Sequence, residues 1–390
     1  MCKFRLKKIY LSIGRKIPLS IVIFLIIIKA MPKGIKHFTC FYKGEFIMKV
    51  EKLVVGVIGL GMGHAHLGAA LDYGAEVALA CDPLESKYER CEKLYNFPRE
   101  KWITDWKEIV NNKDINVVII ATPDQLHREM IHECLEAGKH ILCEKPLALT
   151  REDIEAIVKD VEAHPECKFM IGQICRFTPS FVLAKQYIEE GRMGELYYVE
   201  SEYAHDYMHM FDKPGNWRAD PVRNGVVGGG CHAVDLLRWL VGADPTEVYA
   251  YGTHKLLPKV SYDDANLAIM KFPGDVMGKV FVSTGCKRNY TMRTCVYGTK
   301  GTMIFTNGKE PVQVFEIDEN GNAPAEPVEI DATVNNHNAV AEFKEFADCL
   351  VNDTPIATTV YEGAKTVEVC LSIVESSKTG KVINPNYDFT

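Results

Sequence analysis

The 390-residue chain lacks several features that mark secreted, metal-binding or nucleic-acid-binding proteins. Its thirteen cysteines are an odd number and contain no C-x-x-C pair, which argues against zinc sites and a disulfide framework. Reduced thiols in the cytoplasm are the better interpretation. A net charge of -7 without blocks of like charge provides no basic surface for nucleic acid or anionic lipid. We therefore expect no metal and no nucleic-acid or membrane partner, and a small polar substrate.

The composition is that of a folded protein, with 47% hydrophobic and 25% charged residues. A chain of this length can bury a large core and is expected to divide into about two domains.

The first 47 residues differ from the rest of the chain. Basic residues precede an apolar run at positions 17–28, which is shorter than the roughly 20 residues needed to cross a bilayer. The run resembles a signal peptide, but no small-x-small cleavage pattern follows it. Codons for residues 43–45 can contain a purine-rich ribosome-binding sequence just upstream of Met48. We therefore expect Met48 to be the true start and residues 1–47 to be a mis-called start outside the fold; the alternative is a hydrophobic membrane anchor.

From Lys52 onward, apolar segments alternate with helical patterns. KLVVGVIGLG is a continuously apolar strand that runs into glycines, as a parallel strand covered on both faces does. Further strands are expected at 76–81, 115–121 and 140–143, and helices at 64–73, 83–95 and 125–137. Alternating strands and helices predict a parallel sheet whose carboxyl edge binds the ligand.

A glycine-rich turn follows the first strand. Gly59 and Gly61 permit close approach of a pyrophosphate to the backbone at the start of the next helix, and Met62 and Gly63 complete the turn. Asp82 lies about 20 residues further on, where it can accept hydrogen bonds from ribose hydroxyls. Because its charge would repel a phosphate on that ribose, the pattern predicts NAD rather than NADP as the cofactor.

Two histidines, His64 and His66, follow this turn. His64 occupies the position of the third glycine in G-x-G-x-x-G, so the glycines alone are a weak signal and depend on the strand, the helix and Asp82 for support. We interpret both histidines as residues of a helix start beside phosphates rather than as metal ligands.

The segment from Ala121 to Ala148 carries the most specific pattern. It contains ATP-x-x-x-H followed by AGKH-x-x-x-EKP, and in both motifs the chain resembles the glucose-fructose oxidoreductase, inositol dehydrogenase and rhizopine-catabolism (Gfo/Idh/MocA) family. Similar segments follow, among them FTPSFVLAKQYIEEGRMG, NWRADP, GGGCHAVDLLRWLVG and two closing helical stretches. The resemblance covers residues 52–386.

The resemblance implies an α/β fold with two domains. A Rossmann domain with a parallel sheet is expected at 48–172, and a substrate-binding and oligomerisation domain with a large open, mainly antiparallel sheet at 173–390. The residues independently predict strands of this second sheet at 196–205, 247–254, 265–272, 278–284 and 294–297. Because a broad sheet with one uncovered face needs a partner, a homodimer or homotetramer is expected.

The implied activity is NAD-dependent hydride transfer between the nicotinamide and a hydroxyl of a sugar, polyol or sugar derivative. Two alternatives stay open. One is an NAD-dependent glycosidase that uses transient oxidation and elimination, and the other is a non-catalytic sensor that binds NAD and a sugar.

Lys145, in the EKP motif, is the leading catalytic candidate. The resemblance implies that its ammonium contacts the nicotinamide ribose and the substrate hydroxyl, which favours alkoxide formation as hydride leaves. Glu144 would keep that lysine charged and oriented. Thr122, Pro123 and His127 follow the preceding strand and are expected at the cofactor, although His127 is also suited to supporting the turn.

His232 is the second catalytic candidate. In family dehydrogenases the matching histidine contacts the substrate and helps to move the proton, a task that suits an imidazole near neutral pH. Asp235 lies one helical turn later and either orients His232 or pairs with Arg238 on the helix surface. Many polyol-oxidising members have an aspartate where this chain has Gly228, so a second acid/base group is missing or supplied from elsewhere.

Five further residues are candidates for the substrate pocket. Arg176 resembles the family's arginine near the bound sugar, although an interdomain salt bridge is equally consistent. Tyr203, His205, Trp217 and Arg218 lie in the connection between the domains. Trp217 suits either stacking on a sugar ring or a place in the core.

Overall fold

The computed structural model describes residues 41–42, 45–46, 52–211, 216–307, 310–333 and 338–390. The chain divides into two units, Met1–Ile47 and Met48–Thr390. In the first unit, strands β1 (Phe41–Tyr42) and β2 (Glu45–Phe46) pair antiparallel. The apolar run at 17–28 lies outside the described residues. Among the residues that are described, no helix has the length and apolar character needed to cross a membrane.

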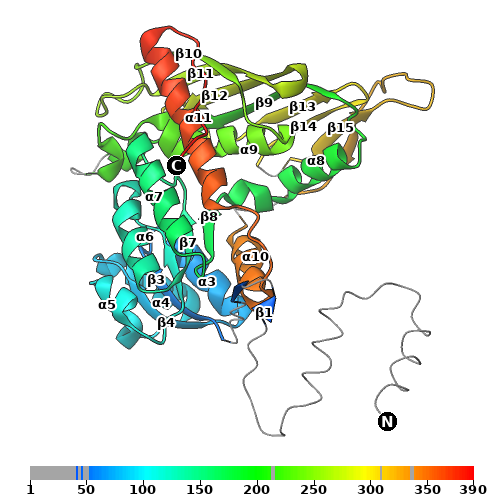
Figure 1. Cartoon of the computed structure of the whole chain (residues 1–390). Coiled ribbons are helices and arrows are strands. Elements are labelled where there is room, and N and C mark those ends of the chain that lie inside the picture. Colours follow the sequence, from blue (N-terminus) through cyan, green and yellow to red (C-terminus); the bar gives the residue numbers. More distant parts are fainter. Residues whose placement is uncertain (1–40, 43–44, 47–51, 212–215, 308–309, 334–337) are drawn as a thin grey trace, which may run out of the picture. The chain divides into compact units, whose positions relative to one another are not determined.

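The second unit begins with a sheet of six parallel strands (Figure 1). In sheet order they are β5 (Trp102–Ile103), β4 (Glu76–Cys81), β3 (Val54–Ile58), β6 (Val117–Ile120), β7 (His140–Glu144) and β8 (Phe169–Gly172). The helices between them are α3 (Gly63–Tyr73), α4 (Glu85–Tyr95), α5 (Lys107–Asn111), α6 (His127–Glu136) and α7 (Arg151–Ala163). The predicted parallel sheet is confirmed; the short strand β5 was not predicted.

Strand β3 explains why the sequence of this sheet is continuously apolar. Successive residues of a strand point to opposite faces. Val55 and Val57 belong to a core that includes Leu67 of α3, whereas Val54 and Ile58 belong to the core that contains residues of α6 and α7. Both faces of the strand are therefore covered, and neither can carry polar side chains.

The strand order places the crevice for a ligand. From β3 the chain proceeds to β4 on one side and later to β6 on the other, so the order reverses between β3 and β6. Ligands of such sheets bind outside the carboxyl ends of the strands at this reversal. The predicted glycine turn follows β3, and the predicted ATP-x-x-x-H segment follows β6.

The second sheet has eight strands. Their order is β10 (Glu247–Thr253), β11 (Ala265–Phe272), β12 (Val276–Ser283), β9 (Leu196–Ala204), β13 (Thr294–Gly298), β14 (Gly301–Phe305), β15 (Val312–Glu316) and β16 (Val328–Ile330). Neighbouring strands are antiparallel except for β12 and β9, which are parallel. The predicted open, mainly antiparallel sheet is confirmed, whereas β14, β15 and β16 were not predicted.

Helices cover one face of this second sheet. They are α8 (Pro179–Glu189), α9 (Cys231–Val241) and α11 (Val360–Thr379) (Figure 1). In β11, Ala268 and Met270 are buried on the helix side, whereas Leu267 and Ile269 on the other side are exposed. This alternation is that of a half-buried strand.

Helix α10 (Ala339–Asn352) connects the end of the chain to the first sheet. It packs against α3, and its residues Phe343, Phe346 and Leu350 share a core with Leu67 of that helix. Helix α11 in turn contacts α7, α9 and β10. The predicted division into domains 48–172 and 173–390 stays a prediction. Helix α10 belongs to the second range in sequence, but it completes the core of the first sheet.

Phe346→Ala should destabilise the protein because its side chain is 0% exposed in the core between α10 and α3. We expect the free energy of unfolding to fall by about 3–5 kcal/mol, measured by equilibrium urea unfolding. Val340→Ala on the same helix is the control, since Val340 is 49% exposed, and should change stability by about 0.5 kcal/mol or less. Equal effects of the two substitutions would contradict this packing.

Candidate active site

Gly59 and Gly61 form the turn between β3 and α3. Gly59 has a φ of 85°, and a Cβ there would lie 2.5 Å from the carbonyl oxygen of Ala121, so both conformation and space require glycine. A Cβ at Gly61 would meet nothing within 4 Å, so the backbone there faces open space. Helix α3 begins at Gly63, and its N-terminal N–H groups and dipole favour an anion. The turn therefore fits the pyrophosphate of a dinucleotide.

Asp82 follows β4 and holds this turn. Its Oδ2 accepts a hydrogen bond from the Leu60 backbone N–H at 2.8 Å, and its Oδ1 accepts one from Leu84 at 2.9 Å. Each carboxylate oxygen keeps a second lone pair, so a ribose hydroxyl can still donate to it. Met62, directly before α3, is exposed beside the turn.

The turn after β6 contains Thr122 and Pro123, which are both half-buried. His127 is fully buried, and its ring nitrogens lie 2.9 Å from the carbonyl oxygen of Pro146 and 3.3 Å from that of Thr122. It thus ties the turn after β6 to the turn after β7. This geometry fits the supporting role rather than direct contact with a cofactor.

Lys145 directly follows β7, and its residue is half-buried. The backbone N–H of Lys145 donates to Oε2 of Glu144 at 3.2 Å. Burial lowers the pKa of the Lys145 ammonium, but Cys231, Glu144 and Asp124 raise it by more, so the pKa lies above its ordinary value. The amine is therefore charged at neutral pH, and it suits hydrogen-bond donation and charge stabilisation rather than proton uptake.

His232 is the second residue of α9, which follows a π-helical turn at Val226–Gly230. Its Nδ1 lies 3.5 Å from the sulfur of Cys175, and its ring stacks on Tyr203 with centroids 6.0 Å apart. Burial raises the pKa of Cys175 well above its usual range and that of Cys231 to about 11, so both are neutral thiols rather than nucleophiles. The imidazole of His232 is the side-chain type in this group that suits proton transfer near neutral pH.

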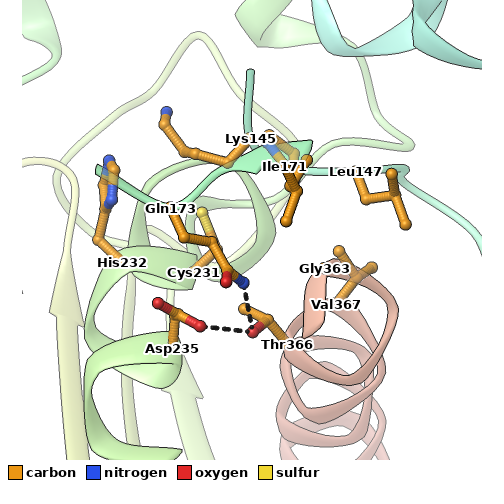
Figure 2. A pocket seen from close by; sticks show the side chains of 11 residues that line it. Lys145, Leu147, Ile171, Gln173, Cys231, His232, Asp235, Gly363, Thr366 and Val367 are labelled. Carbon is orange, nitrogen blue, oxygen red and sulfur yellow. Dashed lines mark hydrogen bonds between the residues drawn. The ribbon is translucent and has the colours of Figure 1, made fainter. Parts of the chain in front are cut away.

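Lys145 and His232 line the same pocket (Figure 2). Its cavity volume is about 10 Å³, close to the space needed for one water molecule. Three more polar side chains line this cavity: Gln173 directly after β8, Asp235 of α9 and Thr366 of α11. The two leading catalytic candidates, predicted from segments far apart in the sequence, are thus brought together.

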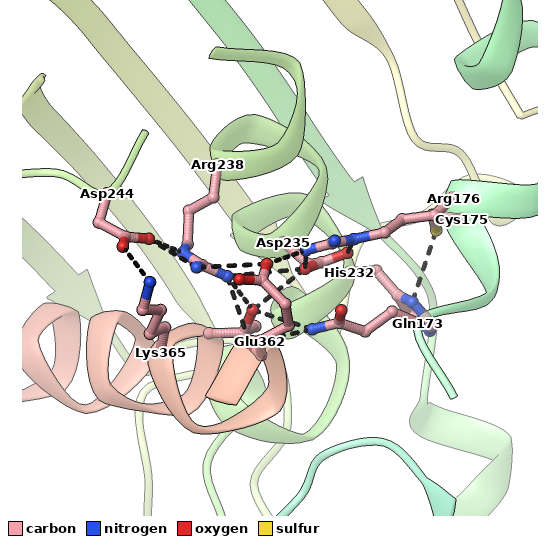
Figure 3. A network of polar contacts seen from close by, with 10 residues as sticks. Gln173, Cys175, Arg176, His232, Asp235, Arg238, Asp244, Glu362 and Lys365 are labelled. Carbon is pink, nitrogen blue, oxygen red and sulfur yellow. Dashed lines mark hydrogen bonds and ion pairs between the residues drawn. The ribbon is translucent and has the colours of Figure 1, made fainter. Parts of the chain in front are cut away.

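Asp235 is buried one turn after His232 in a network of ion pairs (Figure 3). Arg176 donates from Nε and Nη2 to its two carboxylate oxygens at 3.0 and 2.7 Å. The hydroxyl of Thr366 also donates to Asp235 at 3.1 Å, and Arg238 lies 3.8 Å away. The predicted pairing of Asp235 with Arg238 therefore occurs in the interior and not on the helix surface.

Arg176 contacts a second carboxylate in addition to Asp235. Its Nη2 donates to Glu362 of α11 at 2.6 Å. The guanidinium is thus engaged by acidic partners on α9 and α11, which favours the salt-bridge interpretation over contact with a sugar. Both partners belong to residues 173–390, so this bridge joins two helices of the second predicted domain and is not interdomain.

Gly228 leaves room for Arg223. A Cβ at Gly228 would overlap the guanidinium of Arg223, which is buried and donates to Asp124 at 2.6 Å. A side chain at position 228 therefore requires Arg223 to move. Sequence reasoning missed both Arg223 and Asp124, because single charged residues in loops carry no periodic signal.

Trp217 and Arg218 lie in a short 3₁₀ helix, Trp217–Ala219. The guanidinium carbons of Arg218 and Arg223 lie 4.1 and 4.9 Å from the centroid of the Trp217 ring. Gln125 of the ATP segment donates to the Trp217 carbonyl oxygen at 3.0 Å. The loop is thereby attached to the turn after β6. Burial, aided by Arg223, lowers the pKa of Arg218 from its ordinary value.

Tyr203 and His205 lie at the end of β9. The hydroxyl of Tyr203 is 3.2 Å from Nδ1 of His205 and 2.7 Å from the hydroxyl of Tyr207. Tyr290 packs on the rings of both Tyr203 and His205. Together with the stacked ring of His232, these side chains form an aromatic wall beside the pocket, in which Tyr207 and Tyr290 were not predicted.

Known proteins match both parts of this chain. Residues 53–173 match the family model described as oxidoreductase family, NAD-binding Rossmann fold. Residues 181–304 match the GFO/IDH/MocA C-terminal domain.

Individual relatives agree with the family models. Levoglucosan dehydrogenase of Pseudarthrobacter phenanthrenivorans is 30% identical over 298 residues, which cover 66% of this chain and 74% of the relative. The scyllo-inositol 2-dehydrogenase (NAD(+)) of Bacillus subtilis is 28% identical over 341 residues, covering 85% and 95%. A solved structure of levoglucosan dehydrogenase in complex with NADH and levoglucosan superposes with a TM-score of 0.77 at 27% identity, covering 86% of this chain and 100% of that one.

The two halves of this chain thus match the two parts of one family. The same chain has the glycine turn with open space at Gly61, the carboxylate of Asp82 and the lysine after β7. The chain belongs to the Gfo/Idh/MocA family of oxidoreductases and binds NAD through its Rossmann domain.

Proposed function

We propose that this protein oxidises a secondary hydroxyl of a sugar or polyol, with NAD as the hydride acceptor. The observation that carries the proposal is that Lys145 and His232 lie close enough to line one small cavity, next to the end of the strand that precedes Lys145. The named relatives, which act on levoglucosan and inositols, support a polyhydroxylated substrate.

The cofactor would be held by the turn after β3 and the residues around it. Gly61 leaves open space for the pyrophosphate, whereas Gly59 and Gly63 let the turn and the start of α3 pack closely on Ala121. Asp82 would accept hydrogen bonds from the ribose. Thr122 and Pro123 border the same edge of the sheet. Bound NAD supplies the acceptor for the hydride that leaves the substrate carbinol carbon.

Lys145 and His232 would share the work on the substrate hydroxyl. The charged ammonium of Lys145 donates a hydrogen bond to the hydroxyl oxygen and stabilises the negative charge that develops there. His232 takes the proton as the carbon–oxygen double bond forms. Asp235 acts through its network with Arg176 by keeping α9, and with it His232, in place.

The direct test is NADH formation with levoglucosan, scyllo-inositol and other sugars and polyols, with NADP in parallel. Substrate-dependent appearance of NADH supports the proposal. Release of a sugar from a glycoside with no net NADH would instead indicate the glycosidase, and binding of NAD and sugar without either reaction would indicate a sensor.

Lys145→Met should lower kcat by about 10²- to 10⁴-fold, because the hydroxyl loses its charged donor. The side chain keeps its length, so the thermal unfolding midpoint should stay nearly unchanged. Lys113→Met, at an exposed position, is the matched control and should retain full activity. Wild-type turnover by Lys145→Met would exclude this lysine from the reaction.

Asp82→Ser should shift the cofactor preference toward NADP, because the carboxylate that repels a 2′-phosphate is removed. We expect the KM for NAD to rise at least about tenfold and the ratio of NADP to NAD efficiency to increase. Steady-state kinetics with both cofactors measures this, and a thermal melt checks that the turn held by Leu60 and Leu84 survives. An unchanged preference would mean that Asp82 does not contact the ribose.

We further propose that the uncovered face of the second sheet pairs with another copy of the chain. Side chains on that face include Tyr251, Leu267, Ile269 and Met277, which are all exposed and apolar. Such a patch is unusual on a monomer. The free thiols of the described cysteines agree with a reducing compartment such as the cytoplasm.

Ile269→Glu should convert the oligomer to monomers, because the charge would be buried in the pairing face. Analytical ultracentrifugation of wild type and variant measures the change. Val340→Glu, at an exposed site on α10, is the control and should leave the oligomer intact. A wild-type protein that sediments as a monomer would overturn the proposal.

A further inference from the structure

Three buried ionisable side chains meet beside Lys145. They are His66 of α3, Glu144 of β7 and Glu342 of α10, and one nitrogen or oxygen atom of each lies within 4.8 Å of the others. Nε2 of His66 is 2.9 Å from Glu144 and 3.9 Å from Glu342. His66 and Glu342 are both 0% exposed. The cluster thus connects the lysine-bearing strand to helices from both ends of the folded unit.

Glu342 is the unusual member of the cluster. Among the residues that the structure describes, neither of its carboxyl oxygens has a hydrogen-bond partner, and the same is true of Nδ1 of His66. An ionised carboxylate without partners in a protein interior costs several kcal/mol, so a buried carboxyl of this kind stays protonated instead. The carboxyl oxygens of Glu342, which are buried without hydrogen-bond partners among the described residues, therefore indicate a neutral acid in the protein interior.

The charged and titratable groups around Glu342 agree with this assignment. They are His66 from α3, Glu144 and Lys145 from the end of β7, and the thiol of Cys175 from the 3₁₀ helix Ile174–Phe177. Burial is the largest influence and raises the pKa of Glu342 to about 8; Glu144 acts in the same direction, and His66 and Lys145 oppose it.

The other two members form an ion pair. Burial opposes a charge on either group and is the largest single influence on both, but the hydrogen bond and the charge attraction between them, together with neighbouring charges, outweigh it. As a result, the pKa of His66 is raised, and that of Glu144 is lowered with the help of Lys145. The cluster therefore contains His66 in contact with an ionised Glu144, beside the neutral carboxyl of Glu342.

We propose that His66 and Glu342 are positioning residues for the catalytic lysine. His66 holds the Glu144 carboxylate against the backbone of Lys145. The proton on Glu342 prevents this residue from competing with Glu144 for the hydrogen bond of His66. This inference rests on the proposed role of Lys145. Loss of the Glu342 proton puts a second carboxylate 3.9 Å from Nε2 of His66. That carboxylate competes for His66, weakens its bond to Glu144 and changes the charge beside the lysine.

A metal ion fits the same three groups less well than a proton does. Ligand atoms around a tetrahedral zinc ion stand roughly 3.3 Å apart. Here the separation of 2.9 Å between His66 and Glu144 is that of a hydrogen bond, and the 3.9 Å to Glu342 is longer than zinc requires. The nearby ammonium of Lys145 would also repel a divalent cation.

Glu342→Gln is the decisive variant, because glutamine mimics the neutral acid and cannot ionise. The group has a folded-state pKa above its unfolded value of about 4.5, so its contribution to stability is present below about pH 4.5 and is lost as the pH rises through about 8. The thermal midpoint of Glu342→Gln relative to wild type should therefore increase between pH 6 and pH 9, by about 2 °C or more. Glu345→Gln, a partly exposed carboxyl on the same helix, should show no such trend.

Infrared difference spectroscopy tests the proton itself. Wild type at pH 7 should show the carbonyl band of a buried protonated carboxyl, shifted in D₂O and absent both at pH 9.5 and in Glu342→Gln. An identical spectrum of wild type and variant would overturn the assignment. So would stoichiometric zinc in the purified wild type that is lost in Glu342→Gln.

Steady-state kinetics of the Glu342 variants test whether this residue helps to position Lys145. Activity of the wild type should fall on the alkaline side with a midpoint near pH 8, and this fall should shift or vanish in Glu342→Gln, which keeps kcat at pH 7 within about twofold. Glu342→Ala, which leaves a cavity, should lower kcat about tenfold or more without a comparable change in the KM for NAD. An alkaline limb that is identical in wild type and Glu342→Gln would contradict the role. If no sugar or polyol is oxidised at all, the proposed function fails, whereas the melting and infrared data still decide the state of Glu342.

Discussion

The whole site depends on the reversal of strand order between β3 and β6. Parallel strands present their carboxyl ends at one edge, so residues that directly follow β3, β4, β6 and β7 are collected there although they are up to about 90 positions apart. The contact of Gly59 with Ala121 shows how closely the first and third of these turns approach. Any side chain at Gly59 would separate them and widen the crevice that the dinucleotide needs.

The second half of the chain contributes the groups that face this edge. His232 is held on α9, which packs on the second sheet, and α9 is fixed to α11 by the pairing of Arg176 with Asp235 and Glu362. Buried ion pairs of this kind add little net stability, because desolvation offsets most of their attraction. Their directionality is the more useful property here, since a bidentate guanidinium allows few relative positions of the two helices. The imidazole of His232, which α9 carries, is thereby kept in a fixed position relative to α11.

Much of the fold and part of the site could be predicted from the sequence, because those features are local. The strands of the first sheet are continuous apolar runs, and Gly59, Asp82 and Lys145 stand at positions set by strand ends. The partners of these residues could not be predicted. His66 and Glu342 reach Glu144 from helices whose positions are decided by tertiary packing. The sequence therefore indicates for His66 only a helix-start residue beside phosphates, and it does not single out Glu342. Strands β14 to β16 were missed because they are short, with lengths of 5, 5 and 3 residues, and lie toward one edge of the sheet.

The structure shows what occupies the space beside Gly228, where the resemblance led us to expect an acidic residue. The space beside Gly228 is filled by the guanidinium of Arg223, whose partner Asp124 belongs to the turn after β6. A carboxylate is therefore still present near Lys145, but it is supplied by the first half of the chain and is engaged by an arginine. This carboxylate raises the pKa of the lysine, and its Oδ2 is already occupied by the hydrogen bond from Arg223. In the proposed mechanism, proton acceptance is therefore assigned to His232, and Lys145 is the charged donor.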